Sequence, residues 1–192
     1  MQRERGFVFG AAEDGTVYCK EKKCEYILEI EQLDKRWLLE VQKALEKGFG
    51  LKSSIRQRKT RKYYRLVVYS KDLYNELLEM RKDFGKILSA PLQFQKGFVQ
   101  GLFDAEGSVS KRRYSLRAYN KKHKLLHVAK TVLERAGVKP AYLLRDKRGI
   151  WVLHVYGTKN LRKFRQSFGF HHPEKQIILL EKLKTASVQA TS

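Results

Sequence analysis

The alternation of apolar and polar positions divides the chain into two similar halves. An apolar helix rich in small residues is predicted at about 3–13, and a second one at about 94–105. Each helix is followed by two short strands, an amphipathic helix, two more strands and a further helix. The predicted strands are at about 15–20, 25–31, 51–58 and 63–69 in the first half, and at about 107–112, 114–119, 138–146 and 150–156 in the second. The order αββαββα, present twice, favours an α+β fold with two antiparallel sheets.

The amphipathic helix of each half shows the helical period most clearly. Its apolar stripe consists of Trp37, Leu38, Val41, Ala44 and Leu45 in the first half, and of Leu125, Leu126, Ala129, Val132 and Leu133 in the second. Gly50 and Gly137 are predicted to end these helices, because glycine readily adopts the left-handed conformation that closes a helix. Pro173 is predicted to begin a final helix that has no copy in the first half.

Local sequence matches in the same order indicate a duplicated unit. The segment VQKALEKGFGLK at 41–52 reappears as VAKTVLERAGVK at 128–139. Such matches, separated by loops of slightly different length, are typical of an internal repeat. We predict an N-terminal repeat at 1–83, a linker at 84–93 and a C-terminal repeat at 94–192.

The chain is strongly basic, with 41 Lys and Arg residues against 20 Asp and Glu residues and a formal net charge of +21. So large an excess destabilises a compact chain by self-repulsion unless a polyanion offsets it, and nucleic acid is the usual polyanion. A solvated basic surface is the alternative, since thermophile proteins are also rich in charged residues, but the charges of those proteins are usually balanced in sign and these are not. No apolar run approaches the roughly 18 residues of a membrane span, and no signal-peptide pattern precedes Gly6. We therefore expect no membrane partner and an intracellular location, cytoplasmic in a prokaryote or within an organelle.

Both small-residue helices end in a carboxylate that directly precedes a glycine, in GFVFGAAEDGTVY at 6–18 and GFVQGLFDAEGSVS at 97–110. Small side chains let two helix axes approach more closely than the usual distance of about 8–10 Å. If the two helices pack together, Asp14 and Glu106 meet at their partially negative ends and repel each other. A hard divalent cation such as Mg²⁺ removes this repulsion. Each acid alone is explained by an ordinary turn, but two in matching positions favour a metal site.

At these segments the chain resembles the LAGLIDADG family of homing endonucleases. The stretch VQGLFDAEG at 99–107 is similar to the family motif, and FVFGAAEDG at 7–15 is similar to a degenerate first copy in which Gly10 lies one position too late. The resemblance covers nearly the whole chain and is strongest to single-chain, two-repeat archaeal intron-encoded enzymes. It implies two pseudo-symmetric repeats whose sheets form a DNA-binding saddle, joined at a two-helix interface in a monomer.

The resemblance also implies an activity, which is Mg²⁺-dependent hydrolysis of one phosphodiester in each strand of a long, non-palindromic DNA site, leaving short 3′ overhangs. In this family the last acid of each motif binds metal together with the carbonyl oxygen of the preceding residue. The matching residues are Asp14 and Glu106, with backbone oxygens from Glu13 and Ala105. Mn²⁺ or Ca²⁺ can occupy the same sites.

Further catalytic residues follow from the same resemblance. A polar residue after the second strand of each repeat gives Gln32 and Asn120, and a lysine near the end of the fourth strand gives Lys71 and Lys159. These four residues are expected to order water and to offset developing charge. Taken singly, each is equally well explained as a turn or cap residue.

Two windows without any acidic residue, 47–71 and 107–133, contain predicted hairpins. A basic antiparallel ribbon can enter the major groove, where arginine reads guanine and longer side chains reach phosphates. The alternation of the strand near 51–58 places its polar side chains on one face. The predicted DNA-binding residues are Lys52, Ser54, Arg56, Arg58, Lys59, Arg61, Arg65, Lys111, Arg112, Arg113, Arg117, Arg145, Lys147 and Arg148.

Two other functions are compatible with the basic charge and the repeats. One is an RNA-splicing maturase of the same fold, which would bind intron RNA. The other is a non-catalytic nucleic-acid-binding regulator. A protein that only binds gains nothing from carboxylates beside phosphates, so the two acids favour the nuclease.

Overall fold

The computed structural model describes residues 1–58, 62–139 and 141–188. The N-terminal half contains α1 (Gln2–Ala11), the 3₁₀ turn η1 (Ala12–Asp14), β1 (Thr16–Lys20), the 3₁₀ turn η2 (Glu21–Lys23), β2 (Glu25–Gln32), α2 (Lys35–Phe49), β3 (Ser54–Gln57), β4 (Tyr64–Tyr69) and α3 (Lys71–Lys82). The second half contains α4 (Lys86–Ser89), α5 (Leu92–Glu106), β5 (Gly107–Val109), β6 (Ser115–Asn120), α6 (His123–Arg135), β7 (Ala141–Arg145), β8 (Trp151–Tyr156), α7 (Thr158–Ser167) and α8 (Pro173–Val188). The predicted α+β fold with two αββαββα units is confirmed.

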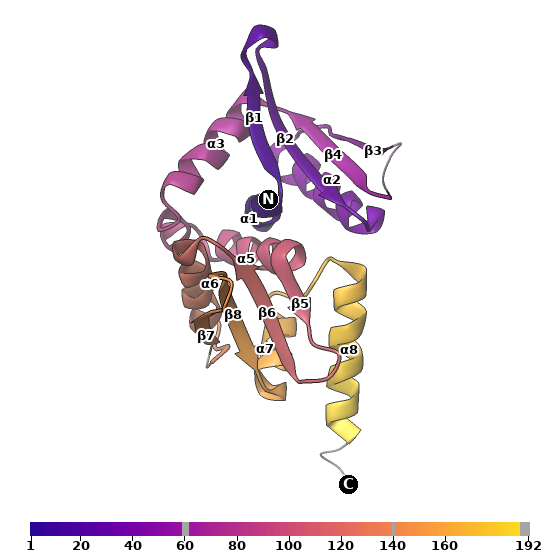
Figure 1. Ribbon diagram of the computed structural model, residues 1–192, viewed down its shortest axis with the longest axis vertical. Helices are drawn as coiled ribbons and strands as arrows, with labels where there is room; N and C mark the ends of the chain where they lie inside the picture. The colour runs from indigo at the N-terminus through magenta and orange to yellow at the C-terminus, as the bar shows by residue number, and fades with distance from the viewer. Residues whose placement is uncertain (59–61, 140, 189–192) are drawn as a thin grey trace.

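The two sheets have the same topology. Each is four-stranded and antiparallel, in the order β1-β2-β4-β3 and β5-β6-β8-β7. Gln32 pairs with Tyr64 in the first sheet, and Asn120 pairs with Trp151 at the equivalent place in the second. Several strands are shorter than predicted: β3 begins at Ser54, and β5 ends at Val109. Figure 1 shows the sheets above and below a central pair formed by α1 and α5.

The central helices α1 and α5 approach each other through glycine. Four glycines form this contact: Gly6 and Gly10 in α1, and Gly97 and Gly101 in α5. A Cβ atom added at any of them would lie 2.0–2.1 Å from a carbonyl oxygen of the facing helix. This is far shorter than a van der Waals contact, so no other residue type fits without moving a helix. The small residues in the two motifs are therefore required by the close approach of two backbones.

The helix ends compensate for the one-residue difference between the motifs. α1 ends at Ala11 and continues as a 3₁₀ turn in which the Gly15 N–H donates to the carbonyl of Ala12 at 2.9 Å. α5 stays α-helical to its end, and the Gly107 N–H donates to the carbonyl of Phe103. Three residues of 3₁₀-helix rise about 6 Å, as far as four residues of α-helix. Four residues separate Gly10 from Gly15, and five separate Gly101 from Gly107. The larger rise per residue of the 3₁₀ turn offsets this difference, so both motifs extend a similar distance along the helix axis.

A continuous hydrophobic core links the two halves. Phe7 and Val8 of α1 and Val99 and Phe103 of α5 are fully or almost fully buried and belong to the same cluster as the inner faces of both sheets. The short helix α4 lies inside the predicted linker at 84–93, and its Ile87 is buried in this core. Burial of this kind fixes the relative positions of the two sheets. Within the part of the chain described, none of the helices combines the length and hydrophobicity that a membrane span requires.

Candidate active site

Two carboxylates mark the ends of the central helices. Asp14 closes η1 and Glu106 closes α5, and each is followed by a glycine: Gly15 directly precedes β1, and Gly107 begins β5. A side-chain amide meets each of them from the end of the neighbouring strand. Gln32 Nε2 donates to Asp14 Oδ2 at 2.5 Å, and Asn120 Nδ2 donates to Glu106 Oε1 at 3.1 Å. The four residues form two equivalent acid–amide pairs, one from each repeat.

The two acids influence each other electrostatically. Burial, followed by the nearby charges of Asp14 and Glu13, raises the pKa of Glu106 to about 7. Burial also raises the pKa of Asp14, against the hydrogen bond from Gln32 and the charge of Lys175, which lower it. Raised pKa values at neighbouring carboxylates mean that ionising both is unfavourable without a cation. The place where the helices end is therefore one that favours binding of positive charge.

Lys175 of α8 supplies a fixed positive charge at this place. Its ammonium donates to the carbonyl oxygens of Phe103, at 3.2 Å, and Asp104, in the last turn of α5. Burial lowers the pKa of Lys175, while Asp104, Asp14 and Glu106 raise it. A cation at the C-terminal end of a helix offsets both the free carbonyls and the negative end of the helix dipole. The repeat pattern did not reveal Lys175, because α8 has no counterpart in the first repeat.

Two further acids lie close by, but their carboxylates have other partners. Glu13, of which only 3% of the side chain is exposed, pairs with Arg81 of α3 at 3.0 Å and with Lys122 at 2.8 Å. Asp104 is buried and accepts hydrogen bonds from the backbone N–H groups of His171, at 2.9 Å, and His172, at 3.1 Å. These contacts join the two repeats and attach the segment before α8 to α5. Asp14 and Glu106 are thus the acids that remain available to a metal.

Side chains supply only some of the oxygen atoms that a hard cation would need at this site. Within the described residues, no group of three or more His, Cys, Asp and Glu side chains could enclose a metal ion. Two carboxylates leave room for backbone carbonyl oxygens, water and phosphate oxygens, which is the kind of coordination that Mg²⁺ prefers. The backbone oxygens of Glu13 and Ala105 precede the two acids and stay predictions.

The structure corrects the assignment of Lys71 and Lys159, neither of which lies beside the carboxylate pair. Lys71 begins α3 directly after β4, and Lys159 lies in the first turn of α7 after β8. β4 runs antiparallel to β2, so its first residue pairs with Gln32 and its last residue pairs five positions away; β8 and Asn120 are related in the same way. Five positions along a strand span roughly 17 Å. Both lysines therefore lie at the far ends of their sheets.

The predicted DNA-binding residues cluster on the exposed faces of the sheets and in their hairpin turns. Ser54, Arg56 and Arg65 share the face opposite the core-facing Ile55 and Leu66. On the second sheet, Arg117 lies on the exposed face. The turn residues Lys111, Arg112, Arg113, Lys147 and Arg148 are exposed, as is Lys52 before β3.

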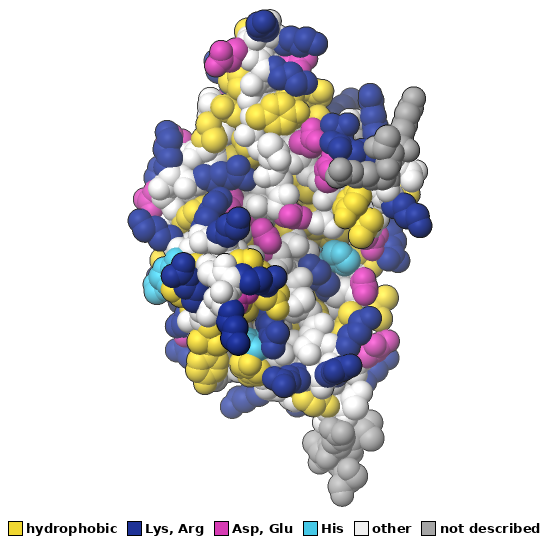
Figure 2. Space-filling model, viewed as in Figure 1, with side chains coloured by type: hydrophobic (Ala, Val, Ile, Leu, Met, Phe, Trp, Pro, Cys, Tyr) yellow, Lys and Arg dark blue, Asp and Glu magenta, His cyan; other side chains and the backbone are white. Residues whose placement is uncertain are grey.

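Six of these residues have side-chain partners within the protein, and two cannot be placed. Arg65 pairs with Glu29 at 3.2 Å, Arg117 donates to His154 at 3.1 Å, and Lys111 lies 3.9 Å from Glu174. Arg58 forms ion pairs with carboxylates of β2, Arg148 pairs with Asp146 at 3.0 Å, and the guanidinium of Arg145 lies 5.8 Å from the centre of the Trp151 ring. Lys59 and Arg61 lie outside the described residues. Figure 2 shows Lys and Arg side chains over the upper and lower halves of the face in view, with acidic side chains near its middle. Contact with DNA stays a prediction for all fourteen positions.

Comparison with models of protein families shows which family the chain belongs to. A family model described as a LAGLIDADG-like domain matches residues 6–80 and again residues 93–169, one match for each repeat. The chain belongs to the LAGLIDADG-like family. The two acid–amide pairs of this LAGLIDADG protein come one from each matched segment, as its pseudo-symmetry requires.

Individual relatives include homing endonucleases. Homing endonuclease I-ApeI of Aeropyrum pernix is 33% identical over 100 residues, which cover 51% of this chain and 45% of that protein. Elongation factor 2 of Methanopyrus kandleri is 33% identical over 103 residues, which cover 54% of this chain and 8% of that protein. The LAGLIDADG chain thus spans less than half the length of each of these two relatives.

Solved structures show the same architecture. Variants of the homing endonuclease I-DmoI superpose with a TM-score of 0.70 at 26% identity, covering 87% of this chain and 90% of that one. An I-DmoI variant in complex with its target DNA in the presence of Mg superposes with a TM-score of 0.69 at 27% identity, covering 87% and 96%. The chain therefore has the two-repeat LAGLIDADG fold of a single-chain homing endonuclease.

Proposed function

We propose that this protein is a site-specific DNA endonuclease of the homing type. It binds a long, non-palindromic duplex as a monomer and, with Mg²⁺, hydrolyses one phosphodiester in each strand, leaving short 3′ overhangs. Membership of the LAGLIDADG-like family and the similarity to I-ApeI and I-DmoI support this activity. The single observation that carries the proposal is the pair of carboxylates at the ends of two glycine-packed helices, each joined to an amide.

The residues at the helix ends fit a divalent metal. The pKa of Glu106 is raised to about 7 by burial and then by the charge of Asp14, so two ionised carboxylates are unfavourable there without added positive charge. Carboxylate, amide and backbone carbonyl groups are the hard oxygen donors that suit Mg²⁺. Mg²⁺ bound by Asp14 and Glu106 supplies activation of water and stabilisation of the leaving oxygen.

Two amide side chains and a lysine hold the two carboxylates of the site in position. Asn120 is held at both ends of its amide, because Nδ2 donates to Glu106 and Oδ1 accepts from the N–H of Lys122 at 2.9 Å. Gln32 has the equivalent position beside Asp14. Both amides fix the orientation of the carboxylate that each of them contacts. Lys175 holds positive charge behind the carboxylates and limits their mutual repulsion.

A cleavage selection tests the proposal. A randomised duplex library is incubated with the protein in Mg²⁺ or EDTA, and cut ends are sequenced. We expect EDTA-sensitive cutting of a defined asymmetric sequence, with one break per strand. Asp14→Asn and Glu106→Gln should abolish cleavage and leave binding largely intact, because each removes one metal-binding oxygen without altering the sheets.

The controls separate cleavage from binding. Glu79→Gln alters an exposed carboxylate of α3 that pairs with Lys82 at 2.6 Å, and it should cut like the wild type. Selective retention of DNA without any nick would identify a binding protein instead. Wild-type cutting by Glu106→Gln would show that the metal assignment is wrong.

A further inference from the structure

The exposed faces of the two sheets carry different chemistry at equivalent positions. The strand pairings define the equivalence, since Gln32–Tyr64 in one sheet corresponds to Asn120–Trp151 in the other. Counting from these pairs, the equivalent positions are Glu29 and Arg117, Glu31 and Tyr119, Arg65 and Val152, and Arg56 and Leu144. The first sheet thus presents two acids and two arginines where the second presents one arginine and three largely apolar side chains.

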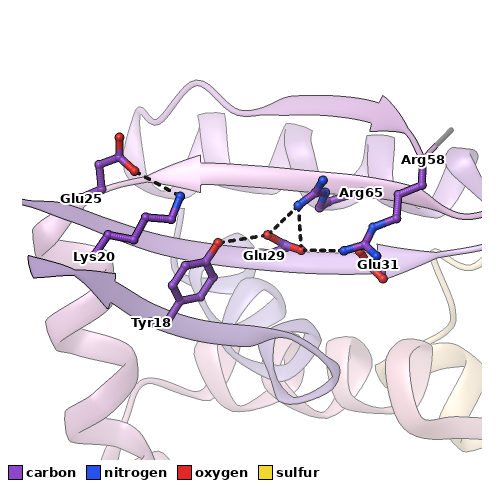
Figure 3. A network of polar contacts seen from close by, with 7 residues as sticks. All are labelled: Tyr18, Lys20, Glu25, Glu29, Glu31, Arg58 and Arg65. Carbon is purple, nitrogen blue, oxygen red and sulfur yellow. Dashed lines mark hydrogen bonds and ion pairs between the residues drawn. The ribbon is translucent and has the colours of Figure 1, made fainter. Parts of the chain in front are cut away.

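On the first sheet Glu29, Glu31 and Arg65 form one connected network with Arg58, the residue that follows β3, whereas Arg56 is not part of it (Figure 3). Glu29 accepts a hydrogen bond from the Tyr18 hydroxyl at 3.2 Å and hydrogen bonds from Arg65 Nη1 at 3.2 Å to each carboxylate oxygen. Arg58 lies between the two acids, with Nη2 3.8 Å from Glu29 and Nε 2.6 Å from Glu31. Only 13% of the Glu29 side chain is exposed. Two carboxylates and two guanidinium groups therefore hold one another in fixed positions, with no net charge.

The second sheet has a basic and aromatic surface instead. Arg117 Nε donates to His154 Nε2 at 3.1 Å, and burial, followed by the charges of Arg117 and Arg113, lowers the pKa of His154 to about 4. His154 is therefore neutral at physiological pH. Within the described residues, no carboxylate forms an ion pair with Arg117. Tyr156 lies 3.6 Å from the His154 ring, centre to centre, beside a depression of about 450 Å³.

The two repeats also differ in overall charge. Residues 94–192 contain 21 basic and 6 acidic residues, whereas residues 1–83 contain 19 basic and 14 acidic residues. The C-terminal repeat thus carries a formal charge of +15 and the N-terminal repeat +5. Because attraction to phosphates depends on excess positive charge, the C-terminal repeat supplies most of the sequence-independent affinity.

We infer that Glu29 and Glu31 determine sequence specificity in the half of the DNA site that contacts the N-terminal sheet. The inference rests on the proposed function, since it takes the exposed sheet faces to lie in the major groove. A carboxylate near DNA is repelled by phosphates whatever the sequence. It is favourable only opposite a base that donates a hydrogen bond, and the N4 amino group of cytosine is the donor that glutamate reads. Arg58 and Arg65 keep the two acids in position and offset the repulsion.

The test compares binding preferences of wild type, Glu29→Gln and Glu31→Gln in the absence of metal, using selection from a randomised duplex library. We expect both variants to lose discrimination, by about tenfold, at base pairs beneath the N-terminal sheet and at none beneath the C-terminal sheet. Each variant releases an arginine, so non-specific binding should strengthen and the slope of log Kd against log salt should steepen by about 0.9 per new phosphate contact.

Glu134→Gln is the matched control, because it makes the same change in charge on α6, where Glu134 pairs with Lys130 at 2.6 Å. It should leave the preferred sequence unchanged. If the wild type selects no sequence, the proposed function fails. If the wild type is selective but both sheet variants keep its preferences, or if Glu134→Gln alters them equally, the inference is wrong and the proposed function stands. Circular dichroism checks folding, and Glu31→Gln decides the outcome should Glu29→Gln unfold.

Discussion

Replacing Gly101 with alanine tests the close helix contact on which the site depends. The added methyl group would lie 2.1 Å from the carbonyl oxygen of Phe7 and 2.8 Å from the backbone nitrogen of Ala11. An ordinary contact to a Cβ atom begins at 3.4 Å, so the helices must separate by roughly 1 Å to accept it. Both contacting atoms belong to the backbone of a buried helix, and neither can rotate away.

The expected cost follows from two opposing terms. Overpacking a core costs about 1–3 kcal/mol, and backbone contacts place this site at the upper end of that range. Alanine is favoured over glycine inside a helix by about 1 kcal/mol. The free energy of unfolding should therefore fall by about 2 kcal/mol, which for a chain of this size lowers the Tm by about 4–8 °C. A shift of the helix ends by roughly 1 Å should also reduce cleavage about 100-fold.

Urea denaturation followed by circular dichroism measures the first effect, and cleavage of a selected site measures the second. Gly48→Ala in α2 is the control, because it has the same helix preference but its methyl group would lie 3.1 Å from the Arg5 backbone nitrogen. Its unfolding free energy should stay within about 1 kcal/mol of the wild type. Gly10→Ala added to Gly101→Ala should cost less than it does alone, because the helices have already separated. A Gly101→Ala variant as stable and as active as the wild type would refute the close packing.

Three other measurements address the charges. Without metal, Glu106→Gln should be more stable than the wild type at pH 8 and equally stable at pH 4. The pKa of Glu106 is about 7 in the folded protein, which is higher than in the unfolded chain. The wild type therefore loses stability as the pH rises from the unfolded pKa to the folded one. The shift corresponds to at most about 3 kcal/mol, and screening at a partly exposed group reduces the expected gain to about 1–2 kcal/mol in urea titrations; no pH dependence of the difference would contradict it. Lys175→Met should destabilise the protein by about 1–3 kcal/mol at pH 7, because it removes the hydrogen bonds from the ammonium to the carbonyl oxygens of Phe103 and Asp104, and Mg²⁺ should restore part of the loss; equal melting temperatures with and without Mg²⁺ would argue against its role as a cation beside the carboxylates. DNA affinity should fall steeply with salt, with a log–log slope of about −0.9 per phosphate contact, and a flat dependence measured by fluorescence anisotropy would exclude binding through the basic sheets.

Recurrence in both repeats is what made much of the fold and site predictable. Asp14 and Glu106 are predicted because each precedes a glycine at the end of a similar helix, whereas Gln32 and Asn120 are implied by the resemblance to the LAGLIDADG family, which has a polar residue after the second strand of each repeat. In the structure a hydrogen bond joins Gln32 to Asp14 and another joins Asn120 to Glu106. A feature that occurs twice at matching positions carries more information than either copy alone, since chance matches rarely recur in order.

Features without a copy, or without a local signal, could not be found in this way. Lys175 lies on a helix that only the C-terminal half possesses. Lys71 and Lys159 do recur, but a position near the end of a strand does not say which end of an antiparallel sheet meets the central helices. Sequence patterns report spacing along the chain, whereas the site depends on the direction in which each strand runs.

The acidic network of the first sheet was missed for a related reason. A contiguous stretch of sequence does not contain it, since residues 47–71 include no acid. Glu29 and Glu31 come from β2, which the sheet order places directly beside β4. Long-range strand pairing thus brings carboxylates to a surface that its own sequence predicts to be purely basic. Charge on a sheet face belongs to several strands and cannot be read from one of them.

The four acids at the helix ends divide into two structural and two available groups. Glu13 is enclosed by Arg81 and Lys122, and the Asp104 carboxylate accepts two backbone N–H groups. These partners hold both carboxylates in place, and burial raises the pKa of Asp104 to about 7. Asp14 and Glu106, by contrast, each contact one neutral amide, which orients a carboxylate without neutralising it. The carboxylates available to a metal are therefore confined to one per helix, and the 3₁₀ turn of the shorter motif lets α1 and α5 end after a similar rise.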